Sequence, residues 1–413
     1  MSEYIFWAFS YVTLFITLIW VQMILVKDAK ARKSSRNPLI TIAVPVYNEE
    51  KGVGRTLESL FNLNYPKDKL QIIAVNHGST DNSLEILRKY ENKITIINLH
   101  RKAGDTKATA VNKALEIAEG EFFVEIDSDT TIENKDALLY LLPHFDDETV
   151  GTVINGIRVR EPETIIEKIQ WFEYLMTTLV RSLMSMMNML IFTHGVFCMS
   201  RTKILKKIGG FAENNFTEDL ELGLKMIYNN YKVKMEVKNY GLTSVPKTFM
   251  SLLDQRVRWY RGFMQNMIKY KTMMFKRKYG LAGTFSMPVG VLSVLMLFTA
   301  MTLLFGKIAV KAYNFMYNIV LLHSDVFFLW KVPSLHDFLL GANWKFLLPF
   351  VITMASVIYL FYKAHKLTNE KFRSPGVFAT YLVTYPFIVS LQWASALYKH
   401  LTDRKVQWSL KKK

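Results

Sequence analysis

The sequence predicts an α/β domain with a doubly wound sheet, inserted between apolar helices long enough to cross a membrane. Hydrophobic residues make up 50% of the 413-residue chain, and they cluster at its two ends in uncharged stretches. Between these ends, short strand-like apolar segments alternate with amphipathic helical patterns, which is typical of a parallel sheet. We therefore expect an N-terminal membrane helix over residues 1–27, a central domain over 38–279 and a C-terminal membrane region over 284–413.

The first apolar stretch, residues 4–26, is uncharged and long enough for a helix to cross a hydrocarbon layer of about 30 Å. The basic residues that follow it directly are Lys27, Lys30, Arg32, Lys33 and Arg36. A signal peptide would have its positive charges before the apolar run and a small-residue cleavage site after it. We therefore expect a retained anchor in a multi-pass protein of the plasma membrane, with the central region in the cytoplasm.

Three further uncharged stretches are expected to cross the membrane, at residues 284–306, 346–362 and 377–398. A weaker stretch, 312–330, is interrupted by His323 and Asp325, so it is a candidate fifth span, interfacial helix or external helix. If the chain crosses the membrane four times, the six basic residues of the C-terminal tail lie outside the cell. If it crosses five times, the tail lies inside, but the four basic residues of the loop before the last span lie outside. The charge bias therefore slightly favours five crossings.

The net charge of +17 fits nucleic acid, anionic lipid headgroups or a phosphorylated substrate as partner. Because of the apolar stretches we expect the lipid bilayer and a phosphorylated substrate, and no nucleic acid. Cys198 is the single cysteine, which excludes an internal disulfide and a thiolate cluster and suits a reducing cytoplasm.

Strands and helices alternate through the central region. The first strand begins at Leu39 and stops at residues 45–48, and later strands are expected over 70–75, 93–99 and 122–126. The expected helices between them cover 53–61, 82–90 and 107–118. In doubly wound sheets, ligands bind beyond the carboxyl ends of the strands, and the polar turns of this sequence fall there.

Two carboxylates, Asp127 and Asp129, directly follow the fourth expected strand. Crowded carboxylates repel each other unless a cation joins them, and hard divalent ions such as Mg²⁺ or Mn²⁺ take oxygen ligands shared with phosphate groups. The pair therefore indicates a diphosphate site. The alternative is a solvated turn that ends a strand, and a lone Asp-x-Asp pattern would favour that alternative.

Further motifs outweigh that alternative. The chain contains, in this order, "VPVYNEE" (44–50), "GSTDNS" (78–83), "EIDSDT" (125–130), "FTEDLELGLKMI" (216–227) and "QRVRWYRG" (255–262). With apolar spans on both flanks, residues 39–264 resemble the family 2 glycosyltransferases. The resemblance is to their membrane-integrated branch, which includes cellulose, hyaluronan and poly-N-acetylglucosamine synthases.

The resemblance implies a GT-A fold and a donor site for the central domain. Donor and nucleotide binding is implied for Pro45, Asn48, Glu49, Asn76, Lys107 and Asp127. Asp127 and Asp129 would hold Mg²⁺ or Mn²⁺ together with the donor diphosphate.

On the acceptor side the resemblance implies that Asp219 is the general base. Contact with the acceptor or the diphosphate is implied for Glu218, Gln255, Arg258 and Trp259. Inverting transfer requires one carboxylate to take the acceptor proton and positive charge to neutralise the departing diphosphate. The alternatives are that Glu218 and Asp219 are first-turn acids of a helix capped by Thr217, and that Trp259 is an ordinary interfacial tryptophan.

Several positions depart from the family pattern or are interpreted as structural. Asn76 and His77 replace two acids, one of which contacts the nucleotide base in the family. An asparagine carbonyl accepts from the N3–H of uracil but pairs less well than a carboxylate with guanine, so a UDP-sugar is favoured and a GDP-sugar is possible. Thr106 replaces the glycine expected before Lys107. We expect Glu125 to pack at the strand edge, and His194 to be structural or to line the acceptor site.

Two amphipathic helices are expected at the membrane surface, one over residues 165–187 and a basic one over 249–278. Packing on the central domain explains the first equally well.

The leading hypothesis is an inverting, metal-dependent glycosyltransferase that elongates a polysaccharide at the membrane. The first alternative is transfer of one sugar to a polyprenyl-phosphate-linked or other lipid acceptor. The second is a non-catalytic membrane subunit with a nucleotide-binding domain. A transporter is less favoured, because the clearest spans contain no ionisable residue.

Overall fold

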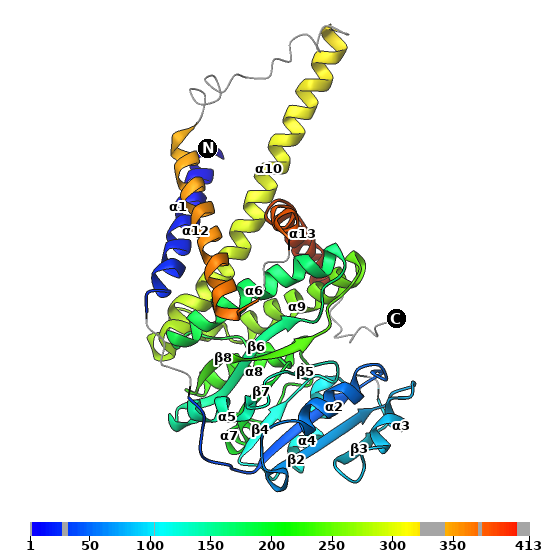
Figure 1. Ribbon diagram of the computed structural model, residues 1–413. Helices are drawn as coiled ribbons and strands as arrows, with labels where there is room; N and C mark the ends of the chain where they lie inside the picture. The colour runs from blue at the N-terminus through cyan, green and yellow to red at the C-terminus, as the bar shows by residue number, and fades with distance from the viewer. Residues whose placement is uncertain (1, 27–31, 103, 323–342, 371–373, 403–413) are drawn as a thin grey trace. The chain divides into compact units, whose positions relative to one another are not determined.

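The structure, a computed structural model, describes residues 2–26, 32–102, 104–322, 343–370 and 374–402 (Figure 1). The chain divides into two compact units. One contains Met1–Lys27 and Val289–Tyr362, and the other contains Asp28–Pro288 and Lys363–Lys413. The second unit holds the α/β domain.

An eight-stranded sheet with the order β3-β2-β1-β4-β7-β6-β8-β5 forms the centre of this domain. The strands are β1 (Ile40–Val46), β2 (Leu70–His77), β3 (Thr95–Leu99), β4 (Phe122–Glu125), β5 (Thr131–Ile132), β6 (Val150–Val159), β7 (Cys198–Arg201) and β8 (Lys232–Thr243). As predicted, β1 to β4 pair in parallel. Their carboxyl ends therefore meet at one edge of the sheet, where the predicted site residues follow them.

The other half of the sheet differs from the predicted parallel arrangement. Strand β7 is antiparallel to β4 and β6, and β5 is antiparallel to β8, whereas β6 and β8 run parallel. The sheet is therefore mixed. The cause is pairing between distant segments, such as Thr131 with Leu242, and no local sequence period encodes such pairing.

Helices cover the sheet and bury their apolar faces. They are α2 (Val53–Phe61), α3 (Ser83–Arg88), α4 (Lys107–Glu116), α5 (Ala137–Leu141), α7 (Thr202–Lys207) and α8 (Glu218–Tyr228). In α2, Val53, Leu57 and Leu60 are fully buried at the helical spacing of three to four residues. This packing fixes the helix against the core of the sheet and so holds the loops at the sheet edge.

Three longer helices of the same unit pack on one another: α6 (Ile165–Met186), α9 (Phe249–Lys269) and α13 (Pro375–Thr402). The ring of Tyr260 on α9 stacks on Trp393 of α13, with 4.2 Å between centroids. The expected helix over 249–278 is too long, because α9 ends at Lys269 and short 3₁₀ turns follow it. Phe275 adopts a positive φ of 62°, which an α-helix does not allow.

Four helices among the described residues are long and apolar enough to cross a membrane: Tyr4–Met23, Ala282–Leu321, Leu347–Thr368 and Pro375–Thr402. They correspond to the four clearest expected spans and include α1 (Ser2–Met23), α10 (Met287–Leu322) and α12 (Trp344–Thr368). Residues 312–322 continue α10 without a break, so the weaker stretch does not start a new helix at residue 312. Residues 323–330 lie outside the described part of the chain.

A buried pair of amides holds α9 against the loop before α8. Asn266 is fully buried; its Nδ2 donates to Asn215 Oδ1 and to Thr217 Oγ1, both at 3.2 Å, and Asn215 Nδ2 donates to Asn266 Oδ1 at 2.7 Å. A buried polar group that loses its partner costs roughly 1–3 kcal/mol. The network therefore fixes where α8 begins.

We expect Asn266→Ala to destabilise the domain by roughly 1–3 kcal/mol for each group left without a partner. The loss of stability is measured as a shift in the midpoint of thermal unfolding, which is monitored through the loss of monodisperse protein in detergent. Asn229→Ala is the matched control, because Asn229 is exposed and bonds only within its own helix end. Equal midpoints for the two variants would contradict the prediction.

Candidate active site

One largely buried ammonium group organises the site. Lys107 is the first residue of α4, and its Nζ lies 2.5 Å from Asp127 Oδ1, 2.7 Å from Glu125 Oε1 and 3.7 Å from Glu218 Oε1. Glu125 ends β4, Asp127 follows it, and Glu218 begins α8. The edge of the parallel strands thus brings together three carboxylates from separate motifs around one cation.

Burial and the Lys107 charge oppose each other in this cluster. Burial, only partly offset by Lys107, raises the pKa of Glu125 to about 7 and also raises the pKa of Glu218. For Asp127 burial is outweighed by the Lys107 ammonium, so its pKa stays below the ordinary value. The carboxylates in turn outweigh burial at Lys107 and hold its pKa well above the ordinary value. Lys107 is therefore charged, and it is bound to a charged Asp127.

Gly195 allows this cluster to form, and the sequence analysis did not identify it. A Cβ atom at Gly195 would collide with Lys107 Nζ and would lie 3.0 Å from Asp127 Oδ1. The carbonyl of Gly195 also accepts a hydrogen bond from the Asp127 backbone N–H at 2.9 Å. The sequence did indicate His194, so the position of Gly195 directly after it was the signal that could have identified this glycine.

Asp219 lies in the first turn of α8, directly after Glu218. Thr193 Oγ1 donates to its backbone carbonyl, and the Leu220 backbone N–H donates to Asp219 Oδ1 at 2.7 Å. Thr217 occupies the N-cap position, but its side chain makes no capping hydrogen bond, so this part of the alternative interpretation does not hold. Instead, Thr217 Oγ1 packs against Gly262 of α9 and accepts from Asn266. The acids nonetheless lie at the positive end of the helix dipole.

The Gln-x-x-Arg-Trp motif lies on α9. Arg258 Nη1 donates to the Phe216 carbonyl at 3.0 Å, just before α8, and Arg258 contributes to lowering the pKa of Asp127. The guanidinium of Arg256 lies 3.9 Å from the ring centre of Trp259, and it pairs with Glu173 at 2.7 Å. Arg256 also donates to Gln255 Oε1 at 2.9 Å. Arg256, which no motif argument placed in the site, thus covers one face of the Trp259 ring.

The turn after β1 supplies the expected nucleotide-pocket residues. Pro45 is buried within β1, and Asn48 adopts a positive φ of 50°. Asn48 Oδ1 accepts from the Thr80 backbone N–H at 2.8 Å, and the Glu49 backbone N–H donates to Ser83 Oγ at 2.8 Å. This turn is therefore fastened to the "GSTDNS" loop that follows β2.

The two departures from the family pattern lie inside the domain. Asn76 is 2% exposed and donates to Asn98 Oδ1 at 2.7 Å, and its Oδ1 accepts weakly from the Ser79 backbone at 3.4 Å. His77 is equally buried, 3.5 Å from Asp105 Oδ2, and burial lowers its pKa. The Asn76 carbonyl expected to contact uracil is thus bonded within the protein.

Comparison with known proteins finds a family match. Residues 41–209, from β1 through β7, match the sequence model of "Glycosyl transferase family 2". This match agrees with the resemblance drawn from the motifs, and the mixed sheet is of the GT-A type.

Curated relatives of this chain are named poly-β-1,6-N-acetyl-D-glucosamine synthases. The protein of Staphylococcus epidermidis is 30% identical over 225 residues, 54% of each chain, and that of Staphylococcus aureus strain COL is 30% identical over 245 residues, 58% of each chain. The chain therefore spans little more than half the length of the curated relatives it matches.

A solved structure shares the fold of nearly the whole chain. It is a mannosyltransferase from Pyrobaculum calidifontis in complex with GDP-Man and Mn²⁺, with a TM-score of 0.62 and 18% identity. The match covers 97% of this chain and 100% of that chain. At this identity the likeness concerns the fold alone.

The two carboxylates that follow β4 fit a hard divalent cation that is also bound by phosphate oxygens. Asp127 and Asp129 offer carboxylate oxygens, and within the described ranges no three histidine, cysteine or acidic side chains gather as a metal cluster. Mg²⁺ commonly takes one or two carboxylates and completes its shell with water and substrate phosphates. Asp129 is held by Arg160, which donates to its carbonyl at 3.0 Å, and by Thr243 Oγ1, 3.5 Å from Asp129 Oδ1.

Two neighbours of the motifs have clear structural roles. His194 is 6% exposed, its Nε2 lies 3.0 Å from the Asn155 carbonyl, and burial lowers its pKa to about 3. A neutral, buried histidine agrees with the structural interpretation. Glu125 is 1% exposed and contacts Lys107, so it belongs to the charged cluster rather than merely packing at the strand edge.

We expect Glu125→Gln to flatten the pH dependence of thermal stability between about pH 5 and 8. The pKa of Glu125, about 7 in the folded chain against 4.5 ordinarily, means that the folded state retains a proton that the unfolded state releases. Its stabilising contribution is complete below pH 4.5 and is lost as the pH rises through 7.

The measurement is the unfolding midpoint of the full chain at several pH values in the presence of a chelator. Glu148→Gln, at an exposed glutamate, is the matched control. Parallel curves for wild type and Glu125→Gln would contradict the assignment.

Proposed function

We propose that this chain is an inverting, metal-dependent glycosyltransferase that moves a sugar from a nucleotide-sugar donor to an acceptor at the membrane. One observation carries the proposal: Glu218 shares the Lys107 ammonium with Asp127, and Asp219 is the next residue of the chain. A candidate base is thereby attached to the residues that would bind the donor. The family 2 domain supports the same reaction class.

In this proposal Asp219 takes the proton from the acceptor hydroxyl as that oxygen attacks the anomeric carbon from the face opposite the diphosphate. General base catalysis of this kind contributes about 10²–10⁴-fold. Lys107 and Arg258 supply fixed positive charge for the negative charge that develops on the leaving diphosphate. No separate acid is needed, because a metal-bound nucleoside diphosphate leaves without protonation.

Asp127 and Asp129 would hold Mg²⁺ or Mn²⁺, which supplies Lewis-acid neutralisation of the diphosphate when bound. Pro45, Asn48 and Glu49 would border the nucleotide. Asn76 is buried and bonded within the protein, so its side chain distinguishes neither uracil nor guanine; a UDP-sugar stays the first donor to test and a GDP-sugar the alternative.

For the product we propose a polysaccharide. The curated relatives are named as synthases of a β-1,6-linked N-acetylglucosamine polymer, so N-acetylglucosamine is the first sugar to test. The four apolar helices support an acceptor held at the bilayer, with the chain as a multi-pass membrane protein. Since four helices are few for a polymer channel, transfer of a single sugar to a lipid-linked acceptor is the second candidate.

The decisive experiment incubates the purified chain in detergent, and native membranes, with radiolabelled UDP- and GDP-sugars and Mg²⁺ or Mn²⁺, and then sizes the product. High-mass, glycosidase-sensitive product supports the polysaccharide synthase. A chloroform-extractable product with one sugar supports the lipid-linked reaction. If folded protein neither transfers a sugar nor hydrolyses the donor, a non-catalytic subunit is favoured instead.

Asp219→Asn should lower the transfer rate by about 10²–10⁴-fold with donor affinity nearly unchanged, because it removes the base but no group in contact with the donor. Transfer rate and equilibrium binding of the nucleotide-sugar are measured on the same preparation. Asp254→Asn, at an exposed aspartate of α9, is the matched control and should retain wild-type transfer. Full activity of Asp219→Asn would refute the assigned base.

Gly195→Ala should lower transfer by roughly 10²-fold while the protein stays folded, since an added Cβ displaces the flexible end of Lys107 from Asp127. Gly376→Ala is the control, because nothing lies within 4 Å of the Cβ it would add. Transfer assays and unfolding midpoints separate the two effects. A large loss of stability in Gly195→Ala, or unaltered transfer, would argue against this role.

A further inference from the structure

Three lysines of the first unit lie on two helices: Lys307 and Lys311 on α10, and Lys345 at the start of α12. The residues of α10 before Lys307, 287–306, are uncharged and rise about 30 Å at 1.5 Å per residue, which equals the hydrocarbon thickness of a bilayer. Lys307 and Lys311 follow directly, and Lys345 is the second residue of α12. In a membrane these ammonium groups would lie at the headgroup level opposite the basic residues that follow α1.

Aromatic residues at the start of α1 bring two of these lysines together. Lys307 Nζ lies 4.5 Å from the ring centre of Phe6, and Lys345 Nζ lies 4.7 Å from that of Trp7. Lys311 is one helical turn beyond Lys307, on the same face of α10. Helices α10 and α12 thus each place a lysine against an aromatic ring in the first turns of α1.

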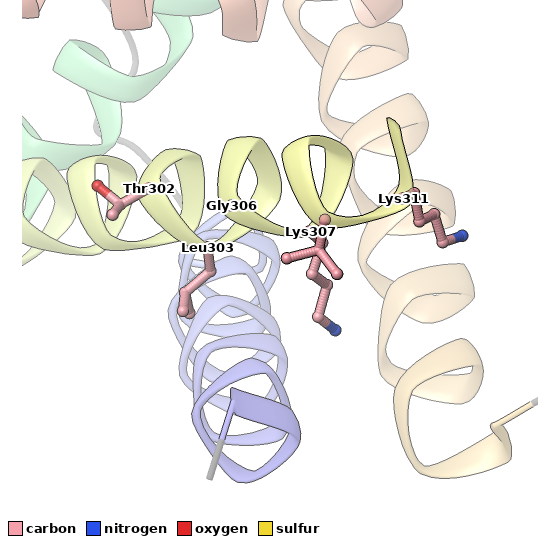
Figure 2. Close-up of a pocket in the computed structure, with 6 residues that line it drawn as sticks. Thr302, Leu303, Gly306, Lys307 and Lys311 are labelled. Atoms are coloured by element: carbon pink, nitrogen blue, oxygen red, sulfur yellow. The ribbon is translucent and has the colours of Figure 1, made fainter. Parts of the chain in front are cut away.

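A cavity of about 430 Å³ opens beside Lys307 and Lys311. It is lined by Thr302, Leu303, Gly306, Lys307, Val310 and Lys311 of α10. Figure 2 shows Leu303, Lys307 and Lys311 extending from the same side of the helix. The lining therefore combines an apolar surface with two ammonium groups, as an amphipathic ligand requires.

Within the described helices α1, α10 and α12, few acidic residues accompany these lysines. Neither α10 nor α12 contains an acidic residue, and Glu3 is the only one in residues 1–27. Lys307 and Lys311, four residues apart, repel each other. Cation–π contacts attract the ammonium groups but leave their charge in place. An anion in the cavity would neutralise both lysines at once.

We propose that this cavity binds the phosphate headgroup of an anionic phospholipid in the leaflet opposite the basic segment after α1, with an acyl chain along Leu303. The proposal rests on the membrane insertion proposed above but not on glycosyl transfer. The positive-inside rule disfavours lysines on this side of a membrane protein, so a specific anionic partner gives them a function. Phe6 and Trp7 suit the same depth, because aromatic residues favour the interface.

The test is native mass spectrometry of the full chain in neutral detergent, titrated with phosphatidylglycerol or phosphatidylcholine. We expect tighter binding of phosphatidylglycerol, and about 25-fold weaker binding in the double variant Lys307→Gln/Lys311→Gln, since each lysine contributes about fivefold. Lys69→Gln/Lys89→Gln, at two exposed lysines of the other unit, makes the same charge change and should bind like wild type. Lys307→Arg/Lys311→Arg should retain binding.

Equal binding of the two lipids, or unaltered phosphatidylglycerol binding in the double glutamine variant, would overturn the proposal. Competition by millimolar inorganic phosphate as strong as that by phosphatidylglycerol would also overturn it, since the site would then bind free phosphate and not a lipid. Because binding is measured without a sugar donor, failure here is distinct from failure of the proposed transfer reaction.

Discussion

The candidate site depends on one largely buried cation, the ammonium of Lys107, shared by Glu125, Asp127 and Glu218. Buried carboxylates are costly unless they are paired. Glu125 and Glu218 are buried and Asp127 is partly exposed, and the three converge here from β4, the segment after it and α8. Removing the ammonium would leave uncompensated negative charge inside the domain. The start of α4 must therefore deliver Lys107 accurately, and the rest of the site is arranged around that position.

Close packing enforces this position from the opposite side. Gly195 leaves no room for a side chain over Lys107 and Asp127, and its carbonyl binds the Asp127 backbone. Gly262 on α9 likewise leaves room for the side chain of Thr217, so that α9 packs directly against the residue that precedes Glu218. Charge pairing and steric closeness thus act together, and a small change at either glycine would act through Lys107 or α8 rather than through the hydrophobic core.

The parallel half of the sheet was predictable because its signals are local. Apolar strands, polar turns and amphipathic helices succeed one another within about 90 residues, and each motif sits at its own strand end. The mixed half was not, since pairs such as Thr131 with Leu242 join distant segments. The same division holds for the candidate site. Lys107, Asp127 and Glu218 could be predicted from sequence motifs. The role of Gly195, the contact of Glu125 with Lys107 and the burial of Asn76 could not, because they depend on packing between distant segments.

Two consecutive acids at the start of α8 have different surroundings, and this difference bears on which of them can act as a base. Successive residues of a helix project about 100° apart, so Glu218 and Asp219 cannot both face Lys107. Among the described residues the ion pairs of Lys107 are with Glu125, Asp127 and Glu218. At Glu218 burial outweighs the ammonium and raises the pKa, so the ion pair fixes the direction of this carboxylate without making it a weaker proton acceptor. Glu218 is therefore committed to Lys107 by its position, and Asp219, outside those pairs, is the acid left to take a proton from an acceptor.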